Sequence, residues 1–308
     1  MDKPLLSICI PTYNRAPFLK ECLASITTQF KNEAIKKKVN IKILDNQSAD
    51  NTKEIVKSFT DIFDNITYVE DDEKRGIAGG LTKAPTLADG EYIWFFSDDD
   101  LHAENSLKIV IDFIEENHTD LILTNLLGFN DKTDVKYLNL LKVNDNAIIK
   151  NRKEFFNLIN KKFYTCIDYY TTFCSNWILK TEIFKSNFYI FDKFNGKYDL
   201  FPFTSTLLYI DKEFSAGIIA EQIILNRKDN ENWRKKDEIK QFFYKNNIWR
   251  DYYKKIIKSN KGHLPKYFIL KVKIKNLASF EELMKIVIII TLRKIGIYDY
   301  IKKIINKK

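Results

Sequence analysis

The chain has 308 residues, of which 45% are hydrophobic and 30% charged, with only 9 glycines and 6 prolines. This composition excludes collagen-like, low-complexity and largely disordered proteins, and the length suits one large domain with an appendage. Charge is unevenly spread, because residues 1–219 hold 27 Lys and Arg against 32 Asp and Glu, whereas residues 220–308 hold 23 against 9. The basic region therefore predicts an anionic partner, such as a membrane surface or nucleic acid.

Short apolar runs alternate with helix-period segments in the first 125 residues. The runs predict strands at residues 5–10, 41–44, 67–70, 91–96 and 120–124, the first of them stopped by Pro11. Helical spacing predicts helices at residues 18–26, 52–59 and 105–117, and a short helix is expected after a glycine-bearing loop at residues 75–80. The run at 91–96 is apolar on both faces, as in the middle of a parallel sheet covered by helices. This order predicts an open, doubly wound α/β sheet.

The pattern from residue 130 to 214 is mixed and aromatic, and the chain beyond residue 221 is predicted to be helical. Helices are expected at residues 152–161 and 203–210, and the basic region continues with helical patterns at 242–257 and 280–305. The segment 280–305 alternates apolar and basic residues, which suits a helix in a membrane interface or an ordinary helix packed on the body. Since no apolar run approaches the ~20 residues of a membrane span and no signal peptide is evident, we expect a cytoplasmic protein.

Polar residues follow the predicted strands, at the edge where open α/β sheets bind ligands. The candidate binding residues after the first two strands and in the glycine-bearing loop are Pro11, Thr12, Tyr13, Arg15, Asp45, Asn46 and Gly76. The fourth strand is followed by Asp98, Asp99 and Asp100. The third strand ends in Glu70, Asp71 and Asp72. Four consecutive strands thus deliver oxygen ligands and hydrogen-bonding groups to one edge.

The acidic triad Asp98–Asp100 is the strongest single feature. Three adjacent carboxylates repel one another, and a hard divalent cation such as Mn²⁺ or Mg²⁺ relieves that repulsion through oxygen ligands. An isolated acidic triplet is more often a solvated loop or a helix cap, but the buried strand before this one favours the cation. His102 is the only His or Cys within ten residues of the triad, and a single such ligand argues against zinc.

Three segments together resemble the family 2 glycosyltransferases of the GT-A fold. They are residues 8–15 (ICIPTYNR), 43–52 (ILDNQSADNT) and 90–101 (GEYIWFFSDDDL), and the resemblance covers residues 5 to about 125. The third segment is most similar to abequosyl- and rhamnosyltransferases of surface polysaccharides. The resemblance implies a GT-A-type, Rossmann-like, mostly parallel sheet flanked by helices over residues 1–219. Residues 1–125 would form its nucleotide-sugar half and 126–219 its acceptor half, followed by the basic helical region 220–308.

The resemblance also implies roles for single residues. Pro11, Thr12, Tyr13 and Asp45 match positions that hold the nucleoside, with Asp45 on the base. Asp98 and Asp99 match the DxD region, which binds the ribose and the metal on the diphosphate. The family pattern commonly begins with Asp where this chain has Ser97, so the register is open: we place the metal on Asp99, with Asp98 and Asp100 as alternatives.

The implied function is metal-dependent, inverting transfer of a sugar from a nucleoside diphosphate to a hydroxyl of a surface glycan, such as lipopolysaccharide or capsule. Its catalytic base is predicted to be Asp199, with Asp192 and Glu182 as further candidates; Asp199 equally suits a capping residue. Docking on the cytoplasmic face of the inner membrane would serve a lipid-linked acceptor. The alternatives are a sugar nucleotidyltransferase and a non-enzymatic basic adaptor for membrane or nucleic acid, although we expect no nucleic acid.

Overall fold

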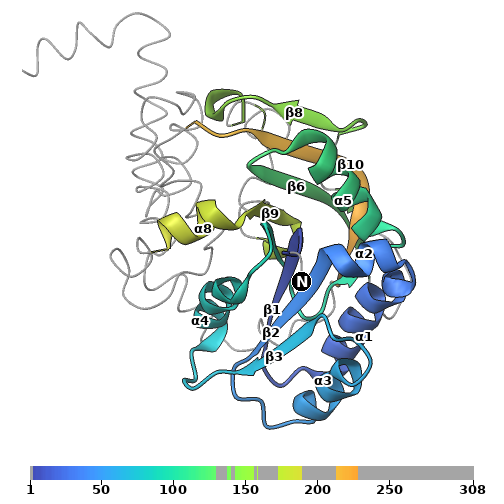
Figure 1. Cartoon of the computed structure of the whole chain (residues 1–308), viewed down its shortest axis with the longest axis vertical. Helices are drawn as coiled ribbons and strands as arrows, with labels where there is room; N and C mark the ends of the chain where they lie inside the picture. The colour runs from blue at the N-terminus through green and yellow to red at the C-terminus, as the bar shows by residue number, and fades with distance from the viewer. Residues whose placement is uncertain are drawn as a thin grey trace, which may run out of the picture. The chain divides into compact units, whose positions relative to one another are not determined.

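The structure is a computed structural model that describes residues 3–129, 137–139, 143–155, 158, 173–188 and 213–227 (Figure 1). All of these residues belong to the first of two units of the chain, Met1–Lys235. The helices predicted at 203–210, 242–257 and 280–305, and the end of the one at 152–161, lie outside the described residues. Among the described residues, no helix has the length and the apolar character needed to cross a membrane.

Strands and helices alternate through the first half of the unit. In chain order the elements there are β1 (Leu6–Thr12), α1 (Ala16–Thr27), the 3₁₀ turn η1 (Thr28–Lys31), α2 (Glu33–Lys38), β2 (Val39–Asp45), α3 (Thr52–Thr60), β3 (Ile66–Glu70), α4 (Gly76–Lys83), η2 (Ala84–Leu87), β4 (Tyr92–Phe95), β5 (Leu101–His102) and α5 (Ser106–Asn117). The later described elements are β6 (Leu121–Phe129), β7 (Tyr137–Asn139), β8 (Ala147–Ile149), η3 (Cys174–Asn176), β9 (Trp177–Lys180), α8 (Thr181–Asn187) and β10 (Ala216–Arg227).

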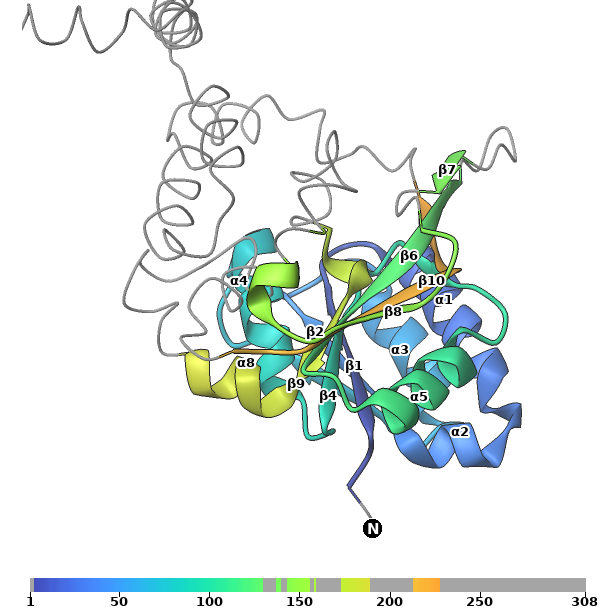
Figure 2. The ribbon, with the colours of Figure 1, turned by 90° about the horizontal axis from the view of Figure 1, so that it is seen from above.

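The described strands form one mixed sheet with the order β3-β2-β1-β4-β9-β6-β10-β5. The four strands β3, β2, β1 and β4 are parallel, as the alternating sequence pattern predicts, and β10 runs parallel to β6. β9 is antiparallel to both of its neighbours, β4 and β6, and so joins the two parallel groups. Helices α1, α2, α3 and α5 cover one face, and α4 and α8 cover the other (Figures 1 and 2).

Helix α1 and strand β4 show how the sequence builds these layers. A proline in the first turn of α1 suits the helix start, and the buried residues Leu19, Cys22 and Ile26 recur on the face turned to the sheet. All four residues of β4 are buried, and Trp94 belongs to the core on the α1 face. Phe95 packs instead against Phe184 of α8, with ring centroids 5.6 Å apart, on the opposite face. The most apolar strand therefore lies inside the sheet between two helical layers.

Several local predictions differ from the structure. Strand β1 continues through Pro11 to Thr12. Pro11 has no N–H to donate to β4, but β4 pairs with β1 only as far as Cys9, so no hydrogen bond of the sheet is lost there. The glycine-bearing segment at 75–80 is not a loop but the first turns of α4. Residues 220–227, predicted to begin the helical region, complete β10, which pairs with the main sheet.

Candidate functional site

The carboxyl ends of β1, β2 and β4 meet at one edge of the sheet, because these neighbouring strands are parallel. Thr12 pairs in register with Asp45, and the backbone N–H of Asn46 donates to the Thr12 carbonyl oxygen at 2.9 Å. The residues predicted at the ends of the first two strands are therefore brought together. The acidic triad follows β4 at the same edge.

Asp45 lies buried at the end of β2, among neutral donors. Its Oδ1 accepts hydrogen bonds from the backbone N–H of Ser48 at 3.0 Å and from the Ser48 hydroxyl at 2.6 Å. Its Oδ2 accepts from the Tyr68 hydroxyl of β3 at 2.6 Å. Burial and the hydrogen bond to Asp45 raise the pKa of Tyr68 above its ordinary value, so that Tyr68 stays a donor at neutral pH. Asp45 is thus a fixed acceptor at the sheet edge.

Asp98 and Asp99 lie in contact with the end of β1. The Thr12 hydroxyl donates to Oδ2 of Asp98 at 2.8 Å, and Nε of Arg15 lies 3.4 Å from Oδ1. Arg15 also pairs through a terminal guanidinium nitrogen with Oδ2 of Asp99 at 2.5 Å, and the Ser97 hydroxyl donates to Oδ1 of Asp99. Burial raises the pKa of Asp98, while Arg15 and Thr12 lower it in part. Four of the predicted site residues therefore form one charged cluster.

Asp100 is completely buried beside this cluster. Its Oδ2 accepts from the Ser175 hydroxyl at 2.6 Å, and its Oδ1 accepts from Nδ2 of Asn226 at 2.8 Å and from the backbone N–H of Arg227 at 3.2 Å. Burial and the neighbouring Asp99 raise its pKa. Since three protein donors enclose its carboxylate, Asp100 differs from Asp99, which keeps partial exposure and contacts Arg15.

The other predicted binding residues surround the start of α4. A Cβ added at Gly80 would lie 3.2 Å from Cβ of Pro11, so a glycine there lets α4 approach β1 closely. Oδ1 of Asn46 accepts from the backbone N–H of Arg75 at 2.7 Å. Gly76 then begins α4 with a φ of +67°, a conformation that glycine adopts without strain.

Tyr13 supplies an aromatic face at the same edge. It is 38% exposed, and Nζ of Lys74 lies 4.8 Å from the centre of its ring. The geometry is that of a cation–π contact. An exposed ring beside a basic group is suited to a planar, anionic ligand.

The donor set at the edge fits a hard divalent cation. Within the described residues, no three His, Cys, Asp or Glu side chains stand close enough to hold a metal by themselves. Mg²⁺ and Mn²⁺ sites of phosphate substrates commonly use one or two carboxylates and complete the shell with phosphates and water. Asp98 and Asp99 offer two adjacent carboxylates, and Arg15 shows that a cation is accommodated there.

Two of the three candidates for the catalytic base lie outside the described residues, and the third lies far from the triad. Asp199 and Asp192 lie outside the described residues. Glu182 lies in α8, next to Thr181, whose N–H donates to the carbonyl oxygen of Glu91 just before β4 begins. Glu182 is therefore at the amino end of β4, and this edge of the sheet is the opposite one from the triad.

Four residues that contact the acidic groups had no signal in the sequence analysis: Tyr68, Ser175, Asn226 and Arg227. Ser175 and Asn226 lie 75 and 126 residues from Asp100 along the chain. Only the position of β9 and β10 in the sheet brings them to the triad. The strand of Tyr68 was predicted, but its pairing with the strand of Asp45 is seen only in the structure.

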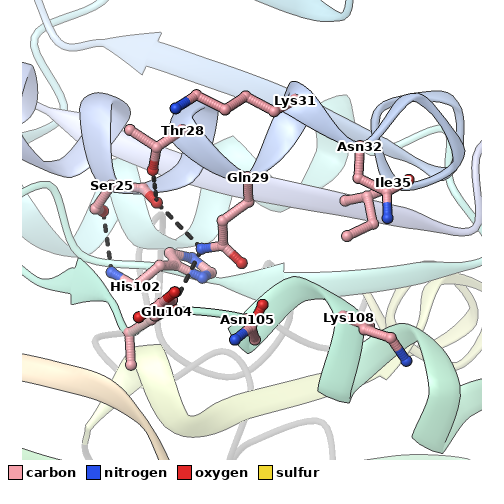
Figure 3. Close-up of a pocket in the computed structure, with 11 residues that line it drawn as sticks. Ser25, Thr28, Gln29, Lys31, Asn32, Ile35, His102, Glu104, Asn105 and Lys108 are labelled. Carbon is pink, nitrogen blue, oxygen red and sulfur yellow. Dashed lines mark hydrogen bonds between the residues drawn. The ribbon is translucent and has the colours of Figure 1, made fainter.

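A separate pocket of about 540 Å³ lies between η1, α2 and the start of α5 (Figure 3). His102 of β5 lines it together with Gln29 and Asn105, and none of the predicted site residues does. Nδ1 of His102 lies 2.9 Å from the Ser106 hydroxyl, and burial lowers the pKa of the ring to about 3. The imidazole is thus a neutral core group at neutral pH.

A protein-family model described as glycosyl transferase family 2 matches residues 7–188. Abequosyltransferase RfbV of Salmonella typhimurium is 35% identical over 112 residues, which cover 36% of this chain and 33% of that protein. Poly(ribitol-phosphate) beta-glucosyltransferase of Bacillus spizizenii is 30% identical over 128 residues, which cover 41% of this chain and 20% of that protein. The alignments thus span a third or less of these two curated relatives.

Two solved structures illustrate the likeness in fold. TarS of Staphylococcus aureus in complex with UDP-GlcNAc aligns with a TM-score of 0.55 and 20% identity, over 73% of this chain and 59% of that one. The mannosyltransferase PcManGT of Pyrobaculum calidifontis in complex with GDP-Man and Mn²⁺ aligns with a TM-score of 0.54 and 16% identity, over 96% of this chain and 77% of that one. The likeness confirms the predicted GT-A-type fold.

Proposed function

The chain belongs to glycosyl transferase family 2, and on this premise we propose that it transfers a sugar from a nucleoside diphosphate to a hydroxyl group of a surface glycan. One observation carries the proposal. Thr12 and Arg15 from the end of β1 contact Asp98 and Asp99 from the end of β4, at the edge where Asp45 ends β2. Membership of a transferase family favours this reaction over the two alternatives, nucleotidyl transfer and a binding role without catalysis.

The nucleotide part of the donor is proposed to lie along β1 and β2. Asp45 would accept a hydrogen bond from the base, since its carboxylate is buried and fixed by Ser48 and Tyr68. The exposed ring of Tyr13 would face the nucleoside. Asp98, fixed by Thr12, would accept from the ribose. These roles use the direction and burial of side chains that the fold holds in place.

Asp99 is proposed to hold the divalent cation, Mn²⁺ or Mg²⁺, next to the donor diphosphate. Of the three carboxylates, Asp98 and Asp100 are buried, at 4% and 0% exposure, whereas 14% of the Asp99 side chain is exposed. Such a cation acts as a Lewis acid that stabilises the negative charge of the leaving diphosphate. Arg15 would stabilise part of the negative charge of the diphosphate, because its guanidinium lies beside Asp98 and Asp99.

The proposed reaction is a single displacement at the anomeric carbon. The acceptor hydroxyl oxygen bonds to that carbon, and the bond from carbon to the diphosphate oxygen breaks with its electron pair on the nucleoside diphosphate. The acceptor proton passes to a carboxylate base, for which Asp199 is the proposed residue. One such displacement inverts the configuration, and a second carboxylate nucleophile is not required.

The acceptor class is proposed from the relatives. One of them is named as an abequosyltransferase and another acts, by its name, on poly(ribitol-phosphate). We propose a comparable acceptor, a lipopolysaccharide, capsule or related glycan, reached at the cytoplasmic face of the membrane through the basic region.

A thermal-shift screen of the purified chain tests the class of reaction. The protein is heated with UDP, GDP, dTDP or CDP, each with and without Mn²⁺. A ligand that binds the folded state alone raises the melting temperature, so one nucleotide is expected to raise it in a Mn²⁺-dependent way. The absence of a shift with all four nucleotides, while sugar transfer is also undetectable, would overturn the proposal.

A further inference from the structure

Strand β10 ends beside the acidic triad, although it lies beyond the residues matched by the family model. We infer that its last two residues, Asn226 and Arg227, are positioning residues that fix Asp99 in the direction needed to bind the divalent cation. The inference rests on the proposed function, which places that cation on Asp99. It assigns a role in metal binding to residues about 126 positions further along the chain.

Asn226 acts on Asp99 through its neighbour Asp100. The amide of Asn226 and the backbone N–H of Arg227 both donate to Oδ1 of Asp100, at 2.8 and 3.2 Å. Ser175 holds the other oxygen at 2.6 Å. A buried carboxylate is costly without such donors, so the side chain of Asp100 has one favourable orientation. The residue following Asp99 is thereby held in place.

Arg227 acts on Asp99 directly. Its Nε donates to the backbone carbonyl oxygen of Asp99 at 3.1 Å, and a terminal nitrogen pairs with Glu21 of α1. Its guanidinium lies 4.8 Å from the ring of Phe129 and 5.2 Å from the ring of Phe18. Only 2% of this side chain is exposed. Arg227 therefore joins the backbone of the triad to α1 and β6 and is itself out of reach of a ligand.

Together these contacts determine where the Asp99 carboxylate points. Its carbonyl and its following residue are both fixed from β10, while its side chain is directed to Arg15 and Ser97. Metal ligands depend on such supporting groups, and loss of an outer partner commonly lowers metal affinity by about 10–100-fold. We therefore expect substitutions of Asn226 and Arg227 to lower the affinity for the cation more than they disturb the rest of the fold.

The test compares two buried asparagines on neighbouring strands. Asn226→Ala removes a donor to the triad, whereas Asn125→Ala on β6 removes an amide that donates to the Ala220 carbonyl oxygen of β10 at 2.7 Å. Both side chains are buried, at 6% and 0% exposure. Free Mn²⁺ is measured by electron paramagnetic resonance during titration of the full chain, with the nucleoside diphosphate that the wild type binds best among UDP, GDP, dTDP and CDP.

We expect Asn226→Ala to weaken Mn²⁺ binding by about tenfold or more and Asn125→Ala to leave it within about twofold, while both variants lose stability to urea. Equal Mn²⁺ affinity in the wild type and in Asn226→Ala would overturn the inference and leave the proposed function standing. A wild type that binds no Mn²⁺ with any of the four nucleotides would overturn both.

A second variant keeps the test decisive if Asn226→Ala does not fold. Arg227→Lys retains the positive charge and the backbone donor to Asp100, but a single ammonium cannot reproduce the planar guanidinium that bonds to Asp99 and Glu21 together. We expect about a tenfold loss of Mn²⁺ affinity with the fold preserved. Wild-type Mn²⁺ affinity in this variant would contradict the role of Arg227.

Discussion

Asp45 and the acidic triad share one edge of the sheet but are held by different parts of the chain. The partners of Asp45 are Ser48 and Tyr68, which lie 3 and 23 residues away. Apart from the adjacent Ser97, the partners of the triad lie between 75 and 128 residues away, in β1, the turn after it, η3 and β10. The Asp45 site is thus complete within the first three strands, whereas the triad requires nearly the whole described sheet.

The two sites also differ in charge. Neutral hydroxyl and amide donors surround Asp45, while a guanidinium contacts Asp98 and Asp99. When ionised, the three adjacent carboxylates carry more negative charge than the guanidinium groups of Arg15 and Arg227 balance, since Arg227 also pairs with Glu21. This difference supports the proposal that Asp45 accepts from a neutral hydrogen-bond donor and that the triad binds a cation.

Replacing Asp99 by Asn gives the largest expected effect, because it removes the proposed metal ligand itself. Since loss of an outer partner alone costs about 10–100-fold, Asp99→Asn is expected to weaken Mn²⁺-dependent nucleotide binding by more than about 100-fold and to abolish sugar transfer. Calorimetric titration with and without Mn²⁺ measures this. Asp112→Asn, at an exposed position paired with Lys108 on α5, serves as the control. Full transfer activity in Asp99→Asn would refute the assignment of the metal.

Replacing Asp45 by Asn sharpens the contrast between the sites. The Asn oxygen can still accept the hydrogen bond from Ser48. The Asn amide nitrogen is a donor, so it cannot accept from the Tyr68 hydroxyl or from the base. We expect roughly a tenfold loss of nucleotide affinity, about the value of one hydrogen bond to a charged group, with unchanged dependence on Mn²⁺. The same calorimetric titration measures both quantities. A changed Mn²⁺ dependence would show that the two sites are not separate.

A matched pair of Ser→Ala variants compares the stability of the two sites. Ser175→Ala removes a donor to fully buried Asp100 and the acceptor of the Ser97 N–H, so we expect a loss of about 2–3 kcal/mol in the free energy of unfolding. Ser48→Ala leaves Asp45 its backbone and tyrosine donors, and the Asn14 N–H that Ser48 accepts is exposed to water, so a loss of about 1 kcal/mol is expected. Urea denaturation checks the order, and an equal loss in the two variants would contradict the distinction between them.

Local patterns in the sequence were sufficient for the parallel group of strands and for the acidic edge. Apolar runs and the polar residues that end them can be recognised from residues close together in the sequence. The hydrogen bond between Asp45 and Ser48, three residues apart, is an example. The insertion of β9 between β4 and β6 and the continuation of β10 past residue 219 depend on pairing between distant segments. No local pattern marks Ser175 or Asn226 as a partner of Asp100, because each reaches it only through the sheet order.

The late position of β10 has a consequence for synthesis of the chain. Asn226 is translated 126 residues after Asp100, which at about 5–20 residues per second is an interval of roughly 6–25 seconds. A nascent chain that has reached Phe188 already contains the whole family match, but Asp100 still lacks two of its three donors. The first three strands can pair during that interval, whereas the triad reaches its final hydrogen bonding only after the ribosome has released β10.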